Sequence, residues 1–312
     1  MKVCVIIPTL NEEENIGKLI DSIKKQSYKN TEIIVIDDGS NDNTKKICLS
    51  KRVKFLENKP GRKGPAFGWN RVARETSAEI ICALGADFFL EDKHFIEKSV
   101  KAFDEKTVAV YNAFHTIQDS WIERALTSEY GISIEPRFIK RKDFLAISGF
   151  PEIGFGEDQV FVKKLENYSK QKRLHSKVVK HAFFSGHGVH SLQEMYKQAF
   201  WYGKTAIAFL TAFSKHASLF ETLKTLFKTF SRPIYFVSFA FLVISTILPN
   251  LFFFTIPFLA ILFSLIFTSC LDFFRQKNPF RFFRIFLFLV FGLGMLHGLI
   301  VNVFLADKKM GA

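Results

Sequence analysis

The sequence of 312 residues predicts an α/β domain with a mostly parallel, doubly wound sheet, followed by an α-helical membrane region of about three spans. Two observations lead to this prediction. Short apolar runs alternate with helical stretches through the first part of the chain, as in doubly wound sheets. In addition, no Asp, Glu, Lys, Arg or His occurs in the 39 residues from Pro233 to Leu271. A composition of 48% hydrophobic and 23% charged residues excludes a disordered or collagen-like protein.

The first forty residues have the pattern of one β–α–β unit. Val3–Ile7 and Glu32–Ile36 are apolar strands, and between them apolar residues recur at helical spacing. Asn11 and Glu14 have the N-x-x-E spacing that caps the start of such a helix. Further strands are predicted at Val53–Leu56, Ile80–Leu84 and Val108–Asn112.

Polar side chains follow these predicted strands directly. They are Thr9, Asn11, Glu12, Asp37, Asp38 and Asp87. Ligands of doubly wound sheets bind at the carboxyl ends of the strands, and carboxylates there suit a base, a ribose or a cation that carries a diphosphate. A single Asp in such a place is commonly a helix cap, whereas the ordered set points to a site. The GxGxxG and GxxxxGK[ST] patterns are missing, which argues against dinucleotide oxidoreductases and P-loop NTPases.

Six short motifs carry a resemblance to a known family. They are Ile7–Glu12, Val35–Asp42, Gly64–Asn70, Gly85–Asp87, Ser148–Phe150 and Gly156–Asp158. In this order they resemble the motifs of the family 2 inverting nucleotide-sugar glycosyltransferases, which have the Rossmann-like GT-A fold. The resemblance covers roughly residues 1–210, and it implies a GT-A domain at residues 1–215.

The resemblance implies a nucleotide-sugar-dependent hexosyltransferase with a UDP- or GDP-sugar as donor. The residues that it assigns to the donor are Pro8, Thr9, Glu12, Asp37, Asp38, Arg62, Lys63, Gly64, Asn70 and Asp87. Asp158 matches the catalytic base, and Glu157 lies beside it. The base would take the proton of an acceptor hydroxyl during a single displacement at the anomeric carbon, which inverts the configuration there.

The metal motif departs from the family pattern. The family has a DxD sequence, whereas this chain has Gly85 in place of the first Asp and keeps Asp87. A divalent cation, Mg²⁺ or Mn²⁺, is still expected but with weaker binding, because Mg²⁺ retains waters and uses substrate phosphates as ligands. His187 is a candidate helper ligand. The alternative is that Arg62 or Lys63 neutralises the leaving group without a strong need for metal.

The acceptor side matches the family only in part. The segment Lys197–Gly203 is a partial match to a Q/R-x-x-R-W pattern of processive and lipid-acceptor relatives: it contains Gln198 and Trp201, but Phe200 stands in place of the Arg, which disfavours long polysaccharide synthesis. The Glu157–Asp158 pair favours a hydroxyl acceptor and the membrane region favours a lipid-linked one. A glycolipid or lipid-linked saccharide meets both conditions, as in cell-envelope glycan biosynthesis. The alternative acceptor is a polyprenyl phosphate of the dolichyl-phosphate type.

The uncharged run is too long for one membrane crossing. As a single helix it would measure roughly 58 Å, about twice the ~30 Å hydrocarbon core. Spans are therefore predicted at 233–249, 251–271 and 285–306, after an interfacial amphipathic helix at 216–232. Basic residues flank the predicted first span and the loop between the last two, which places the catalytic domain of this multi-pass protein in the cytoplasm.

Other functional classes stay open at this stage. Gly85 is also compatible with a catalytically weak, membrane-tethered binding or scaffold protein. A transporter subunit is disfavoured because few polar residues lie in the apolar segments. The net charge of +13 comes from scattered basic residues, which does not predict a nucleic-acid partner. A homo-oligomer is compatible with the sequence.

Overall fold

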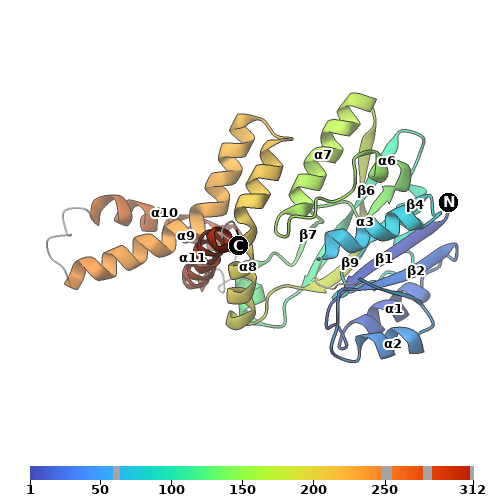
Figure 1. The fold of residues 1–312 in the computed structure, drawn as a ribbon, viewed down its shortest axis with the longest axis horizontal. Coiled ribbons are helices and arrows are strands. Elements are labelled where there is room, and N and C mark those ends of the chain that lie inside the picture. The colour runs from blue at the N-terminus through green and yellow to red at the C-terminus, as the bar shows by residue number, and fades with distance from the viewer. Residues whose placement is uncertain (59–63, 248–254, 277–282, 310–312) are drawn as a thin grey trace. The chain divides into compact units, whose positions relative to one another are not determined.

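The computed structural model divides the chain into two compact units, shown in Figure 1. It describes residues 1–58, 64–247, 255–276 and 283–309, with 247, 268–276 and 303–309 described through their backbone alone. Unit 1 comprises Met1–Ile117 and Tyr130–His187. Unit 2 comprises Gln118–Glu129 and Gly188–Ala312.

Unit 1 contains one sheet, with nine strands among the described residues. Its first part is parallel, as predicted. The central strand β1 (Val3–Thr9) pairs in parallel with β2 (Thr31–Asp37) and with β4 (Ile80–Ala83). β3 (Lys54–Glu57) pairs in parallel with β2. The carboxyl ends of these strands therefore lie at one edge.

The second part of the sheet is mixed, so the prediction of a mostly parallel sheet is wrong there. β8 (Phe138–Lys140) is antiparallel to both of its neighbours, β4 and β6 (Thr107–Ile117). β6 is parallel to β9 (His175–His187), which in turn is antiparallel to the short β5 (Phe88–Phe89). β7 (Tyr130–Ile132) pairs with β6 in the antiparallel sense.

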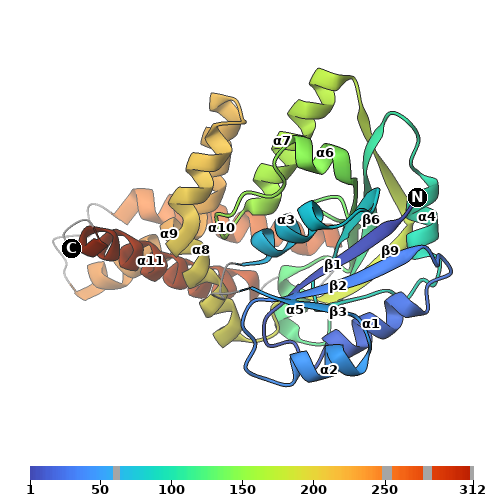
Figure 2. The ribbon, with the colours of Figure 1, turned by 45° about the vertical axis from the view of Figure 1, so that its right-hand side comes forward.

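Helices cover both faces of the sheet because the buried strands are apolar on both sides. Val3, Val5 and Ile7 of β1 belong to one core, and Cys4 and Ile6 to the other. The helices of the first core are α1 (Ile16–Lys24), α2 (Thr44–Ser50) and α4 (Phe95–Lys101). Those of the second are α3 (Pro65–Glu75), α6 (Arg141–Ala146) and α7 (Glu157–Lys172). Figure 2 shows α1 and α2 on the side of β1 and β2 opposite α3.

The predicted cap of the first helix is wrong. Helix α1 begins at Ile16, with Asn15 as the preceding cap residue. Asn11 instead has a left-handed backbone, with φ of 56°, and its side-chain oxygen accepts a hydrogen bond from the Asn41 N–H at 2.8 Å. Asn11 therefore joins two loops at the strand ends rather than capping the helix.

Unit 2 is helical. Its helices are α5 (Trp121–Leu126), α8 (Leu192–Ser214), α9 (Leu219–Ile247), α10 (Thr255–Gln276) and α11 (Arg284–Lys309). Glycines allow α8 and α11 to touch backbone to backbone. A Cβ at Gly203 would lie 1.9 Å from the Met295 carbonyl oxygen, and one at Gly298 would lie 1.9 Å from that of Phe200.

The apolar helices differ from the three predicted spans. Among the described residues, Leu219–Thr246 and Arg284–Asn302 are long and apolar enough to cross a membrane, while Thr255–Phe267 is a shorter apolar stretch. The predicted interfacial helix at 216–232 and the first span are one continuous helix, α9, with Pro233 inside it. The turn predicted at Pro249 and Asn250 lies outside the described residues.

Candidate functional site

Asp37 ends β2 and shapes the turn that follows it. Its Oδ2 accepts hydrogen bonds from the N–H groups of Gly39 at 3.1 Å and Ser40 at 3.0 Å. The Ser40 hydroxyl donates to the other carboxylate oxygen. The side chain is buried, so its oxygens are held in place by the turn that they organise.

Asp38 connects the end of β2 to the start of α3. Its Oδ2 accepts the Gly64 N–H at 2.7 Å, and its Oδ1 accepts a hydrogen bond from the Asn58 side chain at 3.2 Å. Its own N–H donates to the Thr9 carbonyl oxygen at 2.9 Å, which ties it to β1. The predicted basic pair Arg62 and Lys63 lies outside the described residues, immediately before Gly64.

The end of β1 presents a hydroxyl that the protein leaves unused. Thr9 is buried, and its Oγ1 has no hydrogen-bond partner among the described residues. Pro8, next to it, pairs in register with Ile36. The Asn11 N–H donates to the Ser40 hydroxyl oxygen at 2.8 Å, so the loops after β1 and β2 are held together. A buried hydroxyl without a partner is costly, which makes Thr9 suited to a ligand.

Glu12 lies close to the remaining acidic residue of the metal motif. Its Oε2 accepts a hydrogen bond from the Asn15 side chain at 3.0 Å, and its N–H donates to the Thr44 hydroxyl oxygen at 2.9 Å. Burial raises the pKa of the Glu12 carboxyl, and the negative charge of Asp87 raises it further. The structure therefore brings Glu12 and Asp87 into one electrostatic environment.

Asp87 and His187 flank the pairing of β5 with β9. β5 and β9 are antiparallel, with Phe88 opposite Gly186; Asp87 lies in the turn just before β5, and His187 is the last residue of β9. The Phe89 and His187 rings lie 6.2 Å apart and perpendicular to each other.

Gly85 leaves room that Asp87 partly fills. A Cβ at position 85 would lie 2.6 Å from the Asp87 Oδ1. Among the described residues, no three His, Cys, Asp or Glu side chains gather as a metal site. Asp87 carries an oxygen donor and His187 a nitrogen donor, which are ligand types that suit a cation taking its remaining ligands from water and a diphosphate.

Glu157 and Asp158 begin helix α7, after Gly156 with a left-handed φ of 79°. Burial raises the pKa of Asp158; the charge of Glu135 raises it further, and the charge of Arg137 opposes this effect. The Gln159 N–H donates to the Asp158 Oδ1 at 2.8 Å. Burial, followed by the charge of Asp158, raises the pKa of Glu157 to about 8.

An ion pair that the sequence did not predict lies near these acids. Glu135 and Arg137 are 2.7 Å apart, and both side chains are largely buried. The Arg137 guanidinium lies over the rings of Phe88 and Phe184, at 4.9 and 4.8 Å from their centroids. Arg137 therefore connects the strand after Asp87 with the surroundings of Asp158. The only signal in the sequence was a charged pair, Glu-Pro-Arg, next to an apolar strand.

The side chain of Asn70 is hydrogen-bonded to the turn that precedes α7. Its side-chain NH₂ donates to the Phe150 carbonyl oxygen at 2.7 Å, and its oxygen accepts the Phe150 N–H at 2.9 Å. A Cβ at Gly149 would lie 2.2 Å from that oxygen, and Gly149 has a φ of +58°. The Asn70 side chain is thus occupied with the turn that precedes Glu157 and Asp158.

The two predicted acceptor-side residues belong to unit 2. Both lie on α8, where Gln198 is half-buried and Trp201 is 40% exposed. The Trp201 ring packs on that of Tyr202, with 5.7 Å between the centroids.

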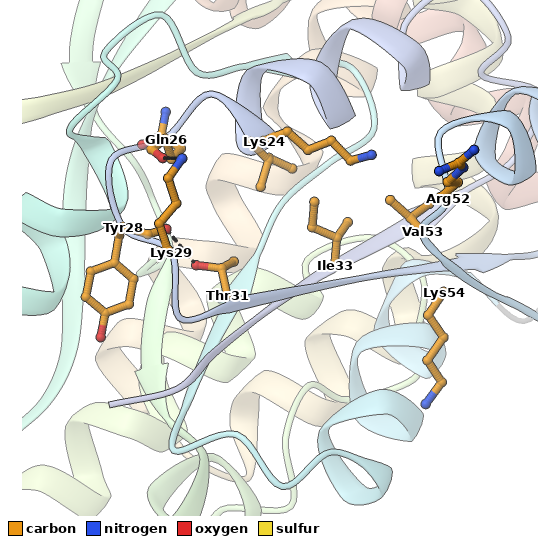
Figure 3. A pocket seen from close by; sticks show the side chains of 10 residues that line it. Lys24, Gln26, Tyr28, Lys29, Thr31, Ile33, Arg52, Val53 and Lys54 are labelled. Carbon is orange, nitrogen blue, oxygen red and sulfur yellow. Dashed lines mark hydrogen bonds between the residues drawn. The ribbon is translucent and has the colours of Figure 1, made fainter.

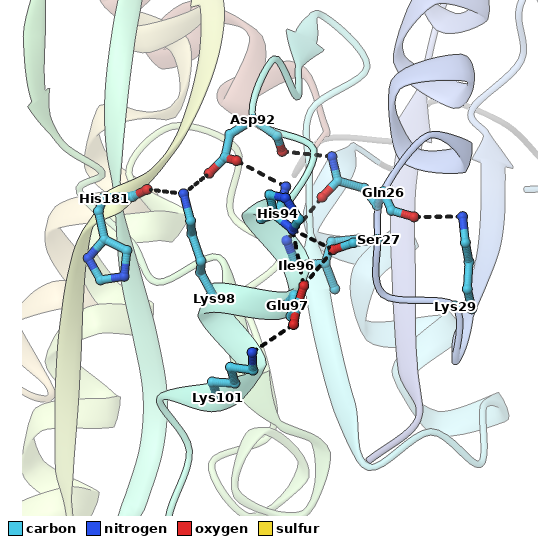
Figure 4. Close-up of polar contacts among 10 residues, drawn as sticks. All are labelled: Gln26, Ser27, Lys29, Asp92, His94, Ile96, Glu97, Lys98, Lys101 and His181. Atoms are coloured by element: carbon cyan, nitrogen blue, oxygen red, sulfur yellow. Dashed lines mark hydrogen bonds and ion pairs between the residues drawn. The ribbon is translucent and has the colours of Figure 1, made fainter.

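Two other polar features of unit 1 lie away from the carboxyl ends of the strands. A cavity of about 290 Å³ lies near the starts of β2 and β3. Figure 3 shows Lys24, Lys29 and Arg52 among its lining residues. Figure 4 shows a hydrogen-bonded network in which Gln26 binds the Asp92 carbonyl oxygen at 2.9 Å and the Ile96 N–H at 3.1 Å. This network joins the end of α1 to α4, and it supports the fold.

Comparisons with known proteins agree with this arrangement. The model of the family described as Glycosyl transferase family 2 matches residues 4–166. A GalNAc(5)-diNAcBac-PP-undecaprenol beta-1,3-glucosyltransferase of Campylobacter jejuni is 31% identical over 153 residues, which cover 46% of this chain and 47% of that protein. The Escherichia coli protein WfgD, a UDP-Glc:alpha-D-GlcNAc-diphosphoundecaprenol beta-1,3-glucosyltransferase, is 38% identical over 88 residues, 27% of this chain and 34% of that protein. The matches thus span less than half of either relative.

A solved structure resembles nearly the whole chain. It is a mannosyltransferase of Pyrobaculum calidifontis in complex with GDP-Man and Mn²⁺, with a TM-score of 0.57 and 15% identity. The alignment covers 97% of this chain and 87% of that one. At this identity the likeness concerns the fold alone.

Proposed function

Because this chain belongs to glycosyl transferase family 2, we propose that it transfers a hexose from a nucleotide diphosphate sugar to a hydroxyl group of a lipid or lipid-linked acceptor. The observation that carries the proposal is the environment of Asp158. This carboxyl is half-buried at the start of α7 beside Glu157, and its pKa is raised.

The strand ends of β1 and β2 support a nucleotide on the donor side. Asp37 and Asp38 are fixed by backbone N–H groups at the carboxyl ends of parallel strands. The buried hydroxyl of Thr9, which has no partner among the described residues, is available to a base or ribose. Sites for small ligands hold them in place through a few placed polar groups of this kind.

The acid–base chemistry follows from the raised pKa. The acceptor oxygen attacks the anomeric carbon while the bond to the diphosphate oxygen breaks, and the bonding electrons leave with the nucleoside diphosphate. Asp158 takes the proton of the attacking hydroxyl. A carboxylate with a raised pKa is a stronger base than an exposed one, and general-base help of this kind contributes ~10²–10⁴ in rate. Attack opposite the leaving group inverts the anomeric configuration.

The leaving diphosphate needs positive charge. Asp87 and His187 would hold a divalent cation here, and that cation would neutralise charge on the diphosphate. Arg62 and Lys63, which precede the Gly64 N–H bound by Asp38, are the second source of positive charge. Gly85 removes one carboxylate from the metal site, so weak metal dependence is part of the proposal.

A lipid-linked acceptor is supported by the relatives and by unit 2. The two relatives named above act, by their names, on undecaprenol diphosphate-linked saccharides. Helices α9 and α11 are long and apolar enough to hold the chain in a membrane, with the catalytic unit in the cytoplasm. A phosphate acceptor would need no base, so the environment of Asp158 favours a hydroxyl over a polyprenyl phosphate.

The test is a transfer assay with the full chain in membranes. Labelled UDP- and GDP-sugars are supplied with and without Mn²⁺, and label is followed into lipid extracts for the wild type and for Asp158→Asn. We expect acid-stable label from one donor, lost in the variant. Label confined to an acid-labile phosphodiester lipid would replace the hydroxyl acceptor by a polyprenyl phosphate. Neither transfer nor donor hydrolysis with any sugar would favour a membrane-tethered binding protein instead.

A further inference from the structure

Arg232 lies where the backbones of α9 and α11 are in close contact. A Cβ at Gly292 would be 2.2 Å from the Arg232 carbonyl oxygen, so the two backbones touch there. The Arg232 side chain extends along α11, with its guanidinium 4.2 Å from the Phe291 ring centroid and 5.0 Å from that of Phe288. Arg232 is also the last charged residue before the apolar part of α9. Its guanidinium is therefore largely enclosed at a boundary between polar and apolar sequence.

A second positive charge shares the same aromatic ring. Arg284 begins α11, and its guanidinium is also 5.0 Å from the Phe288 centroid. The two charges are close enough to act on each other. Among the described residues, no carboxylate forms an ion pair with Arg232. The N-terminal N–H groups of α11 add positive potential beside Arg284.

Enclosing the Arg232 guanidinium is costly without an anion. An enclosed charge with no opposite charge nearby loses its hydration, and a like charge increases the cost. The aromatic rings compensate for part of it through cation–π contacts. A phosphate oxygen compensates more completely, because guanidinium groups bind phosphate with paired hydrogen bonds.

We propose that Arg232, Arg284 and the first turn of α11 form a binding site for the phosphate of an anionic lipid. The inference rests on the proposed membrane attachment of α9 and α11. At the start of an apolar helix the available anions are lipid phosphates, either of bilayer phospholipids or of a lipid-linked diphosphate. Both sources present the same group, and the experiment separates them.

The experiment measures vesicle binding of the full chain at high salt. Vesicles of phosphatidylcholine alone are compared with vesicles that also contain phosphatidylglycerol or undecaprenyl diphosphate. The variants are Arg232→Gln and Arg284→Gln, and the control is Lys228→Gln, which removes an exposed charge one turn earlier on α9. High salt screens exposed charges much more than enclosed ones. Donor hydrolysis by unit 1 and circular dichroism confirm that each variant is folded.

We expect one anionic lipid to strengthen vesicle binding of the wild type. In either arginine variant, this gain in binding should be about tenfold smaller. Lys228→Gln should lose less than about twofold at high salt. The lipid that gives the gain identifies the source of the phosphate. An equal gain in wild type and both arginine variants would overturn the site. Failure of the wild type to bind any vesicle would instead contradict the membrane attachment on which it rests.

Discussion

The two groups of carboxylates in unit 1 are held in opposite ways. Asp37 and Asp38 accept hydrogen bonds from the backbone N–H groups of Gly39, Ser40 and Gly64. The Glu157–Asp158 pair lies at the start of a helix. Burial and neighbouring acidic groups raise the pKa of both carboxyls.

This difference separates binding from proton transfer. Carboxylates held by N–H donors stay fixed as acceptors, which suits recognition of base and ribose groups. Carboxyls whose pKa is raised by burial can take up a proton during a reaction. The same side-chain types thus perform two tasks in one unit, and each task predicts a different response to mutation.

Asp158→Asn should give the largest effect. The amide cannot accept the proton of the acceptor, so we expect transfer to fall by ~10²–10⁴. Binding of nucleotide, measured by calorimetry, should change little because Asp37 and Asp38 are untouched. Asp42→Asn is the matched control, since Asp42 also accepts backbone N–H groups near a helix start, from Glu13 and Thr44 at 3.0 Å each. An unchanged rate of transfer in Asp158→Asn would contradict the role of Asp158 as the base.

Asp38→Ala should act on the donor side instead. It removes the acceptor of the Gly64 N–H and of the Asn58 side chain, so the start of α3 loses its tie to β2. Hydrogen bonds to charged groups are worth ~1.5–3 kcal/mol, which corresponds to about 10- to 100-fold. We expect this loss in the KM for the donor, with a smaller change in kcat. A loss confined to kcat would place Asp38 in the chemical step and erase the contrast between the two groups.

The strands that position the Asp37–Asp38 group were predictable, and the wider surroundings of both groups were not. The local apolar runs of β1, β2 and β4 predicted the strands that carry Thr9, Asp37 and Asp38. The pairing of β8 between β4 and β6 depends on contacts between distant segments, which periodicity does not contain. The same holds for Arg137, whose place depends on Phe88 and Phe184 from two other strands.

The individual roles were harder to predict than the set of residues. Asn70 matches the family motif, but its hydrogen bonds go to Phe150 rather than towards the strand ends. In unit 2, composition predicted a helix boundary before Pro233, whereas α9 continues through it. Proline removes one helical hydrogen bond, and packing between neighbouring helices can offset that loss.

Gly85→Ala tests the reduced metal motif, which belongs to neither group of carboxylates. The new Cβ would lie 2.6 Å from the Asp87 Oδ1, so this carboxylate must turn away. We expect the Mn²⁺ concentration for half-maximal transfer to rise about tenfold, as for other changes that reorient a metal ligand. Gly131→Ala is the control, because no atom lies within 4 Å of a Cβ at that position. An equal Mn²⁺ dependence in both variants would mean that Asp87 does not hold the cation.

Glu157→Gln should give the smallest effect, and it concerns stability. Glu157 has a pKa of about 8 in the folded chain against an ordinary value of 4.5, so the folded state holds its proton more tightly than the unfolded state. Its contribution to the free energy of unfolding is therefore full below about pH 4.5 and is lost as pH rises towards 8. Each pKa unit corresponds to ~1.4 kcal/mol, so the wild type should lose more than ~1 kcal/mol across this window. In denaturant unfolding, the free energy of unfolding of Glu157→Gln should depend less steeply on pH than that of the wild type. An equally steep dependence would mean that Glu157 is ionised at neutral pH and that the Asp158 carboxyl has a charged neighbour.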